Sequence, residues 1–197
     1  MNTALIWSFL LLAIPAFFTP GPNNLMLMTS SARFGLARTT PHAIGIVFGF
    51  PFMVFAVSLG LGEIFHAFPM VKTVLKYLSA AYLLWLAWHL LSLRIGEVTT
   101  TARPLRPYEA ALFQWVNPKG WAMATSFAAA FVISGPDRFM SIIWLTLGCL
   151  ALAPASSLTW MVFGERLQAF LRRTGTERYL GAILALLLLA AVILFFI

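Results

Sequence analysis

The sequence predicts an all-α polytopic membrane protein in which six transmembrane helices form two inverted three-helix repeats, with helices 1 and 4 broken. Three observations lead to this prediction. Hydrophobic residues make up 61% of the chain and charged residues only 10%, against roughly 25% charged residues in ordinary soluble domains. Six apolar stretches are long enough to cross a bilayer, and two of them are interrupted by proline and glycine. A soluble chain with so few charges would expose apolar surface, so the composition indicates a membrane protein.

Six segments supply the predicted helices, because a helix needs about twenty mainly apolar residues to cross about 30 Å of hydrocarbon. They lie near residues 4–30, 42–64, 72–93, 110–133, 140–163 and 179–197. A polar linker at residues 97–106 divides the chain. We therefore expect a single transmembrane domain over residues 1–197, with one repeat at about 1–96 and the other at about 107–197.

The first segment is interrupted by Thr19-Pro20-Gly21-Pro22-Asn23-Asn24. Proline has no backbone N–H and biases the preceding residue away from helical angles, and Gly21 adds backbone freedom. Within hydrocarbon, irregular backbone is tolerated only where it is buried in protein or lines a cavity. The fourth segment has a second interruption, Asn117-Pro118-Lys119-Gly120, which follows the first after almost half of the 197 residues. Paired interruptions in the two halves of a polytopic protein indicate a transport site.

The second segment contains Gly45 and Gly49, which have the GxxxG spacing that allows two helices to approach closely. Simple helix packing is the preferred interpretation of this pair.

The orientation of the predicted helices follows from the positive charges between them. Nine lysine and arginine residues lie in the first, third and fifth connections, and three lie in the second and fourth. Because positive charge concentrates on the cytoplasmic side, the odd connections are expected in the cytoplasm and both termini outside. Two halves of three segments then have opposite orientations, which is the inverted-repeat plan of many secondary transporters. A five-segment arrangement with one re-entrant segment is the alternative.

Each helix that restarts after a break presents free backbone N–H groups and the positive end of its dipole. Two such ends facing one cavity would attract an anion, above all a carboxylate. Lys119 adds the only formal charge well inside a segment, where an ammonium costs about 3 kcal/mol on insertion scales. We expect Lys119 to bind the substrate carboxylate or, alternatively, to carry a coupled proton. Snorkelling of Lys119 to the nearby cytoplasmic face is the structural alternative.

Amide side chains in the two breaks are expected to contact the polar remainder of the substrate, although capping of the broken helices is an equally good interpretation of any one amide. Ser156, Ser157 and Thr159 follow Pro154 in the fifth segment and have two interpretations. They satisfy carbonyl groups freed by the proline, or they contact a ligand. The predicted substrate-binding residues are Pro20, Gly21, Pro22, Asn23, Asn24, Gln114, Asn117, Pro118, Lys119 and Gly120.

The sequence argues against an enzyme. It contains no HExxH, GxSxG or Walker motif, and its acidic residues lie in or beside connections, so no catalytic residue, cofactor or metal site is expected. The net charge of +7 comes from basic residues between apolar segments, so contact with lipid head groups is expected rather than with nucleic acid. Without a nucleotide site, uphill transport must use a proton or ion gradient.

The two breaks, together with Ala32-Arg33-Phe34-Gly35, Gly45 and Ala81-Tyr82-Leu83-Leu84-Trp85-Leu86, resemble the LysE/RhtB family of amino-acid exporters over essentially the whole chain. This resemblance implies a multi-pass protein of the bacterial inner membrane that exports amino acids or their derivatives, uses the proton-motive force and forms oligomers. The direction of transport is implied by the resemblance alone. The neutral-amino-acid branch (homoserine and threonine type) fits better than the lysine branch, because no acidic residue lies where it could pair with a cationic side chain.

The resulting hypothesis is a secondary exporter of small amino acids that binds the substrate carboxylate at the broken helices. The alternative is a structural or regulatory subunit of a membrane complex, whose breaks only pack against a partner.

Overall fold

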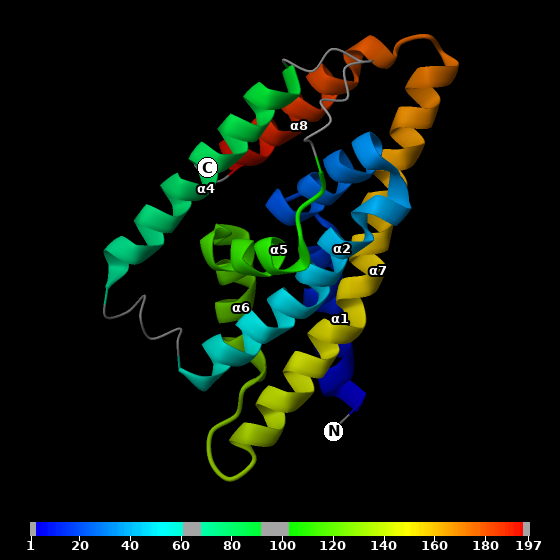
Figure 1. Ribbon diagram of the computed structural model, residues 1–197. Helices are drawn as coiled ribbons and strands as arrows, with labels where there is room; N and C mark the ends of the chain where they lie inside the picture. The colour runs from blue at the N-terminus through cyan, green and yellow to red at the C-terminus, as the bar shows by residue number, and fades with distance from the viewer. Residues whose placement is uncertain (1–2, 61–67, 92–102, 195–197) are drawn as a thin grey trace.

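The computed structural model describes residues 3–60, 68–91 and 103–194, and these residues form helices, turns and short irregular connections (Figure 1). The elements in chain order are α1 (Thr3–Phe18), α2 (Pro22–Leu59), α4 (Pro69–Leu91), α5 (Pro107–Phe113), the 3-10 helix η2 (Gln114–Val116), α6 (Pro118–Phe131), α7 (Arg138–Arg173), the 3-10 helix η3 (Glu177–Tyr179) and α8 (Leu180–Leu194). By length and composition, α2 and α7 are able to cross a membrane. The all-helical prediction is therefore confirmed for the described part of the chain.

Both predicted breaks are present. The first segment ends as α1 at Phe18 and restarts as α2 at Pro22, and the fourth is divided into α5, η2 and α6. The third, fifth and sixth segments lie on α4, α7 and α8. Helix α7 continues beyond the predicted end at residue 163 to Arg173, because no proline or positive-φ residue lies between residue 163 and Gly175 (φ 66°). Most of the predicted linker lies outside the described residues.

The connection between the first two predicted segments is a single bend within α2 at Gly35. Its φ of 79° and ψ of 168° lie where side chains other than glycine are strained. Thr39 Oγ1 donates to the Gly35 carbonyl at 2.9 Å and lies 3.2 Å from Ser30 Oγ, so hydroxyl groups hold the two parts of α2 together. The sequence predicted a longer connection, from residue 31 to residue 41, because this stretch is rich in polar and basic residues. The structure keeps it helical except at Gly35.

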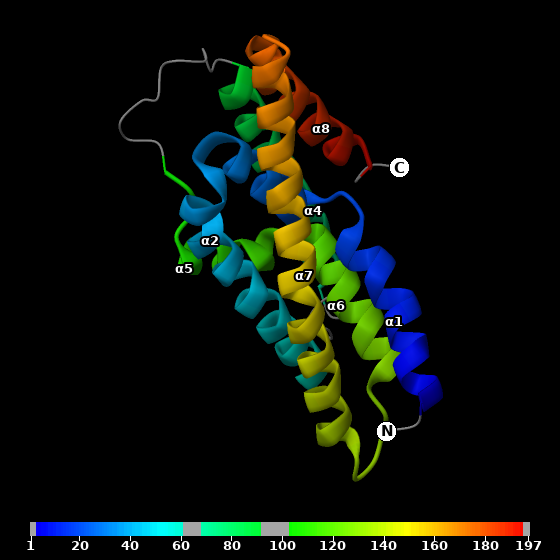
Figure 2. The same ribbon diagram turned by 90° about the vertical axis from the view of Figure 1, so that its right-hand side faces the viewer.

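Helix α7 runs along both parts of α2 and forms the most extensive contact in the molecule (Figure 2). The approach is close at Gly164, where a Cβ atom would collide with the Met28 carbonyl oxygen. Ser31 Oγ donates to the Met161 carbonyl at 2.7 Å at the same place. Small residues therefore let these two long helices come into backbone contact.

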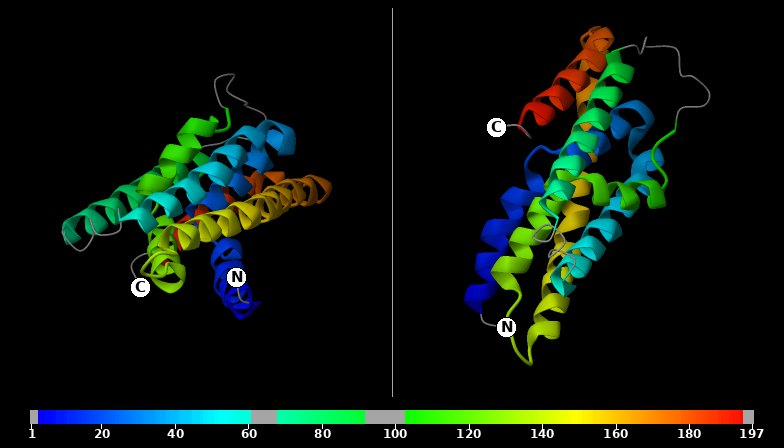
Figure 3. Two further views of the ribbon diagram at one scale, coloured as in Figure 1. Left: turned by 90° about the horizontal axis from the view of Figure 1, so that it is seen from below. Right: turned by 90° about the vertical axis from the view of Figure 1, so that its left-hand side faces the viewer.

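Helices α4 and α8 lie side by side on the other flank of the molecule (Figure 3, right view, green and red). Leu83 and Leu90 of α4 and Leu184 and Leu188 of α8 are fully buried in one apolar cluster. This cluster contains no polar side chain, so the α4–α8 pair serves as apolar support for the rest of the fold.

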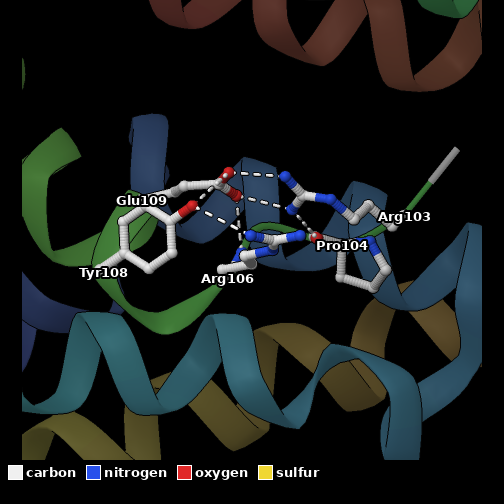
Figure 4. A network of polar contacts seen from close by, with 5 residues as sticks. All are labelled: Arg103, Pro104, Arg106, Tyr108 and Glu109. Carbon is white, nitrogen blue, oxygen red and sulfur yellow. Dashed lines mark hydrogen bonds and ion pairs between the residues drawn. The ribbon is translucent and has the colours of Figure 1, made fainter.

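Helix α5 crosses the second part of α2 through the predicted glycine pair. A Cβ atom on Gly45 would collide with the Pro107 carbonyl oxygen, and one on Gly49 would lie 2.7 Å from Ala111 Cα. The close approach predicted from the GxxxG spacing is therefore confirmed, and its partner is α5. The start of α5 is fixed by Glu109, which accepts two hydrogen bonds from Arg103 at 2.6 and 2.7 Å and one from the Arg106 N–H at 2.8 Å (Figure 4).

Helices α1 and α6 pack through aromatic rings. Phe9 lies edge-on to Phe127 and Phe131, with ring centroids 6.1 and 5.6 Å apart, and Phe17 stacks on Phe127 at 6.4 Å. This contact brings the end of α1 to the beginning of α6, so the two breaks meet.

The ends of α4 and α7 and the beginning of α8 lie at one end of the molecule, and the beginnings of α1 and α7 lie at the other (Figure 1). The bend of α2 also lies toward the first end (Figures 1 and 2). Six arginines belong to that bend, to the last turns of α7 and to η3: Arg33, Arg38, Arg166, Arg172, Arg173 and Arg178. Basic residues of the first and fifth predicted connections therefore gather toward one end of the molecule.

Candidate functional site

The two breaks are joined by a pair of amide side chains. Asn23 Nδ2 donates to Gln114 Oε1 at 2.7 Å, and Gln114 Nε2 donates to Asn23 Oδ1 at 3.2 Å. Gln114 is fully buried and also donates to the Ala110 carbonyl at 2.8 Å. Because each amide satisfies the other, the beginning of α2 is fixed against the α5–η2 segment with no buried polar group of this pair left unpaired.

The last carbonyl groups of α1 have no helical partner, and side chains from three other elements satisfy them. The Phe17 carbonyl accepts from Asn24 Nδ2 at 2.8 Å and from Ser156 Oγ of α7 at 2.7 Å. The Thr19 carbonyl accepts from Asn24 Nδ2 at 2.9 Å and from Lys119 Nζ at 2.8 Å. Asn24, Lys119 and Ser156 thus hold the end of α1 in place.

Lys119 crosses from the second break to the first. Its ammonium donates to the Thr19 carbonyl and to Thr19 Oγ1, both at 2.8 Å, and to the Pro20 carbonyl at 3.3 Å. Its stem lies over Gly21, where a Cβ atom would be 2.5 Å from Lys119 Cδ. The position suits a cation, because the C-terminal end of a helix carries partial negative charge. Lys119 therefore bridges the two breaks and does not point away along the α6 surface.

The beginnings of α2 and α6 supply backbone donors beside this bridge. Helix α2 starts at Pro22 after Gly21, and no side chain caps it. At α6, Asn117 Oδ1 accepts from the Lys119 N–H at 3.1 Å. Among the described residues, the N–H groups of Asn23, Asn24 and Gly120 have no hydrogen-bond acceptor. Two helix N-termini with free donors therefore lie next to each other.

A small, partly open cavity of about 40 Å³ lies between these helix ends. Its polar lining comes from both breaks and from α7, and its apolar lining from α1, the second part of α2 and α6. The lining residues are Ala16, Phe17, Gly21, Asn23, Asn24, Ile46, Phe50, Asn117, Lys119, Gly120, Met123, Ala153, Ser156 and Ser157.

All ten residues predicted for the site lie in the two breaks that meet here, and six of them line the cavity. These six are Gly21, Asn23, Asn24, Asn117, Lys119 and Gly120. Pro22 and Pro118 begin α2 and α6, Pro20 contributes a carbonyl acceptor for Lys119, and Gln114 lies behind Asn23. The capping interpretation of the amides holds for Asn24, which caps α1, and for Asn117, which caps α6.

The sequence did not place Ile46, Phe50 or Met123 in the site. Ser156 and Ser157 line the cavity, and their contact with a ligand, one of the two interpretations of the hydroxyls after Pro154, stays a prediction. Ser156 also donates to the Phe17 carbonyl at the end of α1, a role that neither interpretation included. The apolar lining residues resemble ordinary core residues in the sequence and give no signal. The hydroxyls after Pro154 were a usable signal, because small polar groups beside a helix irregularity often face a cavity.

Comparison with known proteins relates the whole chain to one family. The sequence model of the family described as LysE type translocator matches residues 14–197. An uncharacterised membrane protein of Pseudomonas aeruginosa is 32% identical over 183 residues, which cover 85% of this chain and 82% of that protein. The cysteine/O-acetylserine efflux protein of Escherichia coli K12 is 25% identical over 191 residues, and that of Klebsiella pneumoniae is 28% identical over the same length, each covering 95% of both chains.

No solved structure matches the chain. The family match extends over both breaks, α2 and α7. The chain belongs to the LysE type translocator family.

Proposed function

We propose that this protein is a secondary active exporter of small neutral amino acids or their derivatives in the bacterial inner membrane, driven by the proton gradient. The family is one of translocators and not of enzymes, and relatives are named as efflux proteins for cysteine and O-acetylserine. The observation that carries the proposal is the meeting of the two broken helices around one polar cavity.

The substrate carboxylate is assigned to the beginnings of α2 and α6. The free N–H groups of Asn23, Asn24 and Gly120 are donors of the kind that bind anions at helix N-termini. Both helix dipoles add positive potential at that place. A carboxylate there would gain charge-assisted hydrogen bonds without displacing any existing cap of α2.

The side chain of the substrate is assigned to the remainder of the lining. Phe17, Ile46, Phe50 and Met123 give an apolar wall, and Ser157 adds a hydroxyl. No carboxylate belongs to the lining, so a lysine or arginine side chain would have no charged partner there. Small neutral side chains with at most a short polar group fit this lining best.

An inverted repeat gives the proposed route to alternating access. In this repeat the first part of α2 is equivalent to α6, the second part of α2 to α7, and α4 to α8. Helix α2 also packs against α7, and α4 packs against α8. Packing of equivalent helices across a pseudo-two-fold axis is the arrangement in which one repeat moves against the other around a central site.

Transport by the purified protein in liposomes tests the proposal. We expect liposomes loaded with cysteine, O-acetylserine or another small neutral amino acid to take up the labelled compound by counterflow. Lys119→Met should reduce this uptake at least tenfold at equal amounts of inserted protein, because it removes the link between the breaks. Arg138→Gln is the matched control, since Arg138 also donates to a helix-end carbonyl, that of Ser58, but away from the cavity. Absence of counterflow with every standard amino acid would support the structural-subunit alternative.

A further inference from the structure

The end of α1 forms a binding site for a primary ammonium group, and Lys119 occupies it. The Thr19 carbonyl, Thr19 Oγ1 and the Pro20 carbonyl accept one hydrogen bond each from Lys119 Nζ, at 2.8, 2.8 and 3.3 Å. A primary ammonium has three N–H donors and no acceptor, so these three oxygens match its full hydrogen-bonding capacity.

The electrostatics of the site are those of a cation site. Unpaired carbonyl groups at a helix C-terminus carry about half an elementary negative charge in total. Thr19 and Pro20 are exposed residues that directly precede Gly21, which lines the cavity. No carboxylate lines the cavity, and the site therefore holds its ammonium through neutral oxygens, without an ion pair that would have to be broken.

An amino acid carries the same ammonium group as Lys119 and, in addition, a carboxylate. We propose that the oxygens of Thr19 and Pro20 are the binding site for the ammonium group of the substrate, with Lys119 as its internal substitute. The substrate ammonium displaces Lys119 from the end of α1, and the released Lys119 pairs with the substrate carboxylate at the beginnings of α2 and α6. This inference rests on the proposed function for the identity of the ligand.

The exchange predicts that both charged groups of the substrate are needed. A zwitterion replaces the lysine on the carbonyl groups and gives the lysine a new partner, so no charge in the cavity is left unpaired. A ligand with a carboxylate alone would draw Lys119 away and leave Thr19 Oγ1 and the Pro20 carbonyl without the donor that they have now. A ligand with an ammonium alone would leave Lys119 unpaired in a largely apolar surrounding.

The ammonium site is tested first by chemical complementation. In Lys119→Ala the site is empty, and we expect methylammonium chloride to raise the melting temperature of the purified variant by a few degrees. Tetramethylammonium chloride at equal concentration should not, because it has no N–H donor. Lys119→Met is the matched control, since its side chain fills the space without a charge, and neither salt should stabilise it selectively. An equal response of Lys119→Ala to both salts, or an equal response of Lys119→Met, would overturn the site.

The exchange is tested on the unaltered protein by competition. We expect a transported amino acid to be displaced by other free amino acids of its class, but at least tenfold less well by its N-acetyl derivative and by its methyl ester. Equal competition by the N-acetyl derivative would overturn the ammonium site while leaving the proposed function intact. Absence of transport for every amino acid would reject the proposed function, and the methylammonium experiment would still decide the ammonium site.

Discussion

Single residues at the breaks both donate to free backbone carbonyl groups and line the cavity. The first of these roles stabilises an interrupted helix within a membrane. Asn24 donates with one amide nitrogen to the Phe17 carbonyl of α1 and to the Thr19 carbonyl just after it. Lys119 donates to the Thr19 and Pro20 carbonyls and brings the only charge to the cavity lining. Free backbone groups in hydrocarbon cost several kcal/mol each. The polar side chains that stabilise the break are therefore the same ones that are available to a substrate.

Gly21→Ala is predicted to impair transport through Lys119 and not through the backbone. The φ of Gly21 is −174°, an extended conformation that any residue adopts, but the new Cβ would lie 2.5 Å from Lys119 Cδ. The stem of Lys119 must then move, and misplacement of a positioning group by about 1 Å can cost on the order of 100-fold. We expect counterflow to fall roughly tenfold or more with little change in melting temperature. If the effect passes through Lys119, adding Gly21→Ala to Lys119→Ala should cause no further loss.

The sequence predicted the residues of the two breaks but not their partners. Proline and glycine within an apolar run identify Pro20, Gly21 and Pro118 directly, since few other structures accommodate them. The partner of each amide depends on which helix ends meet in space. Asn23 and Gln114 are separated by 91 positions in the chain, and nothing in either local sequence specifies the other.

At the scale of helices, small residues and short polar caps decide where the broken segments lie. Helix α5 is only 7 residues long and too short to be stable by itself. Contact with Gly45 and Gly49 and the cap at Glu109 hold it in place, so that Gln114 can reach Asn23. The glycine spacing predicted this close contact, whereas the identity of the partner helix could not be read from it.

Gly45→Leu is predicted to separate α5 from α2. A side chain at this position would overlap the Pro107 carbonyl oxygen, which belongs to backbone and cannot move aside cheaply. Overpacking of this kind typically lowers the free energy of unfolding by about 1–3 kcal/mol. We expect a lower melting temperature in detergent and a loss of counterflow. Ile44→Ala, at a neighbouring position that is 44% exposed, should change the melting temperature much less, and an equal decrease would contradict the packing argument.

The cap of α5 should make its start sensitive to acid. Hydrogen bonds from Arg103 and from the Arg106 N–H lower the pKa of Glu109 from 4.5 to about 2. Glu109 precedes the predicted membrane-spanning part of α5 and α6. Because the pKa is lower in the folded protein, the stabilisation is complete above pH 4.5 and is lost as the pH falls toward 2.

Glu109→Gln removes this dependence. We expect the melting temperature of the variant to lie below that of the unaltered protein at neutral pH, and the difference to shrink as the pH falls through the acidic range. A difference that stays constant down to pH 2 would show that the carboxylate charge does not stabilise α5.

At the scale of the whole molecule, the helices place the cavity between parts that are distant in sequence. Helix α1, both parts of α2, α6 and α7 all contribute to the lining, while α4 and α8 contribute no lining residue and pack against the first part of α2 through Leu25, Met28 and Ala32. The sequence predicted helices, breaks and a charge asymmetry, because each depends on local composition. It left open whether Ser156 and Ser157 of α7 satisfy backbone carbonyl groups or contact a ligand, since that depends on which face of a 36-residue helix turns toward the breaks.

Accessibility of the breaks to water and substrate tests the central claim most directly. Cys149 is the single cysteine of the chain and is buried, so a Cys149→Ala background allows cysteines to be introduced one at a time over residues 18–26 and 114–122. We predict that a water-soluble thiol reagent modifies positions in both breaks, and that the transported amino acid slows modification in both together. Modification of one break only, or of neither, or protection in one break without the other, would contradict a shared cavity.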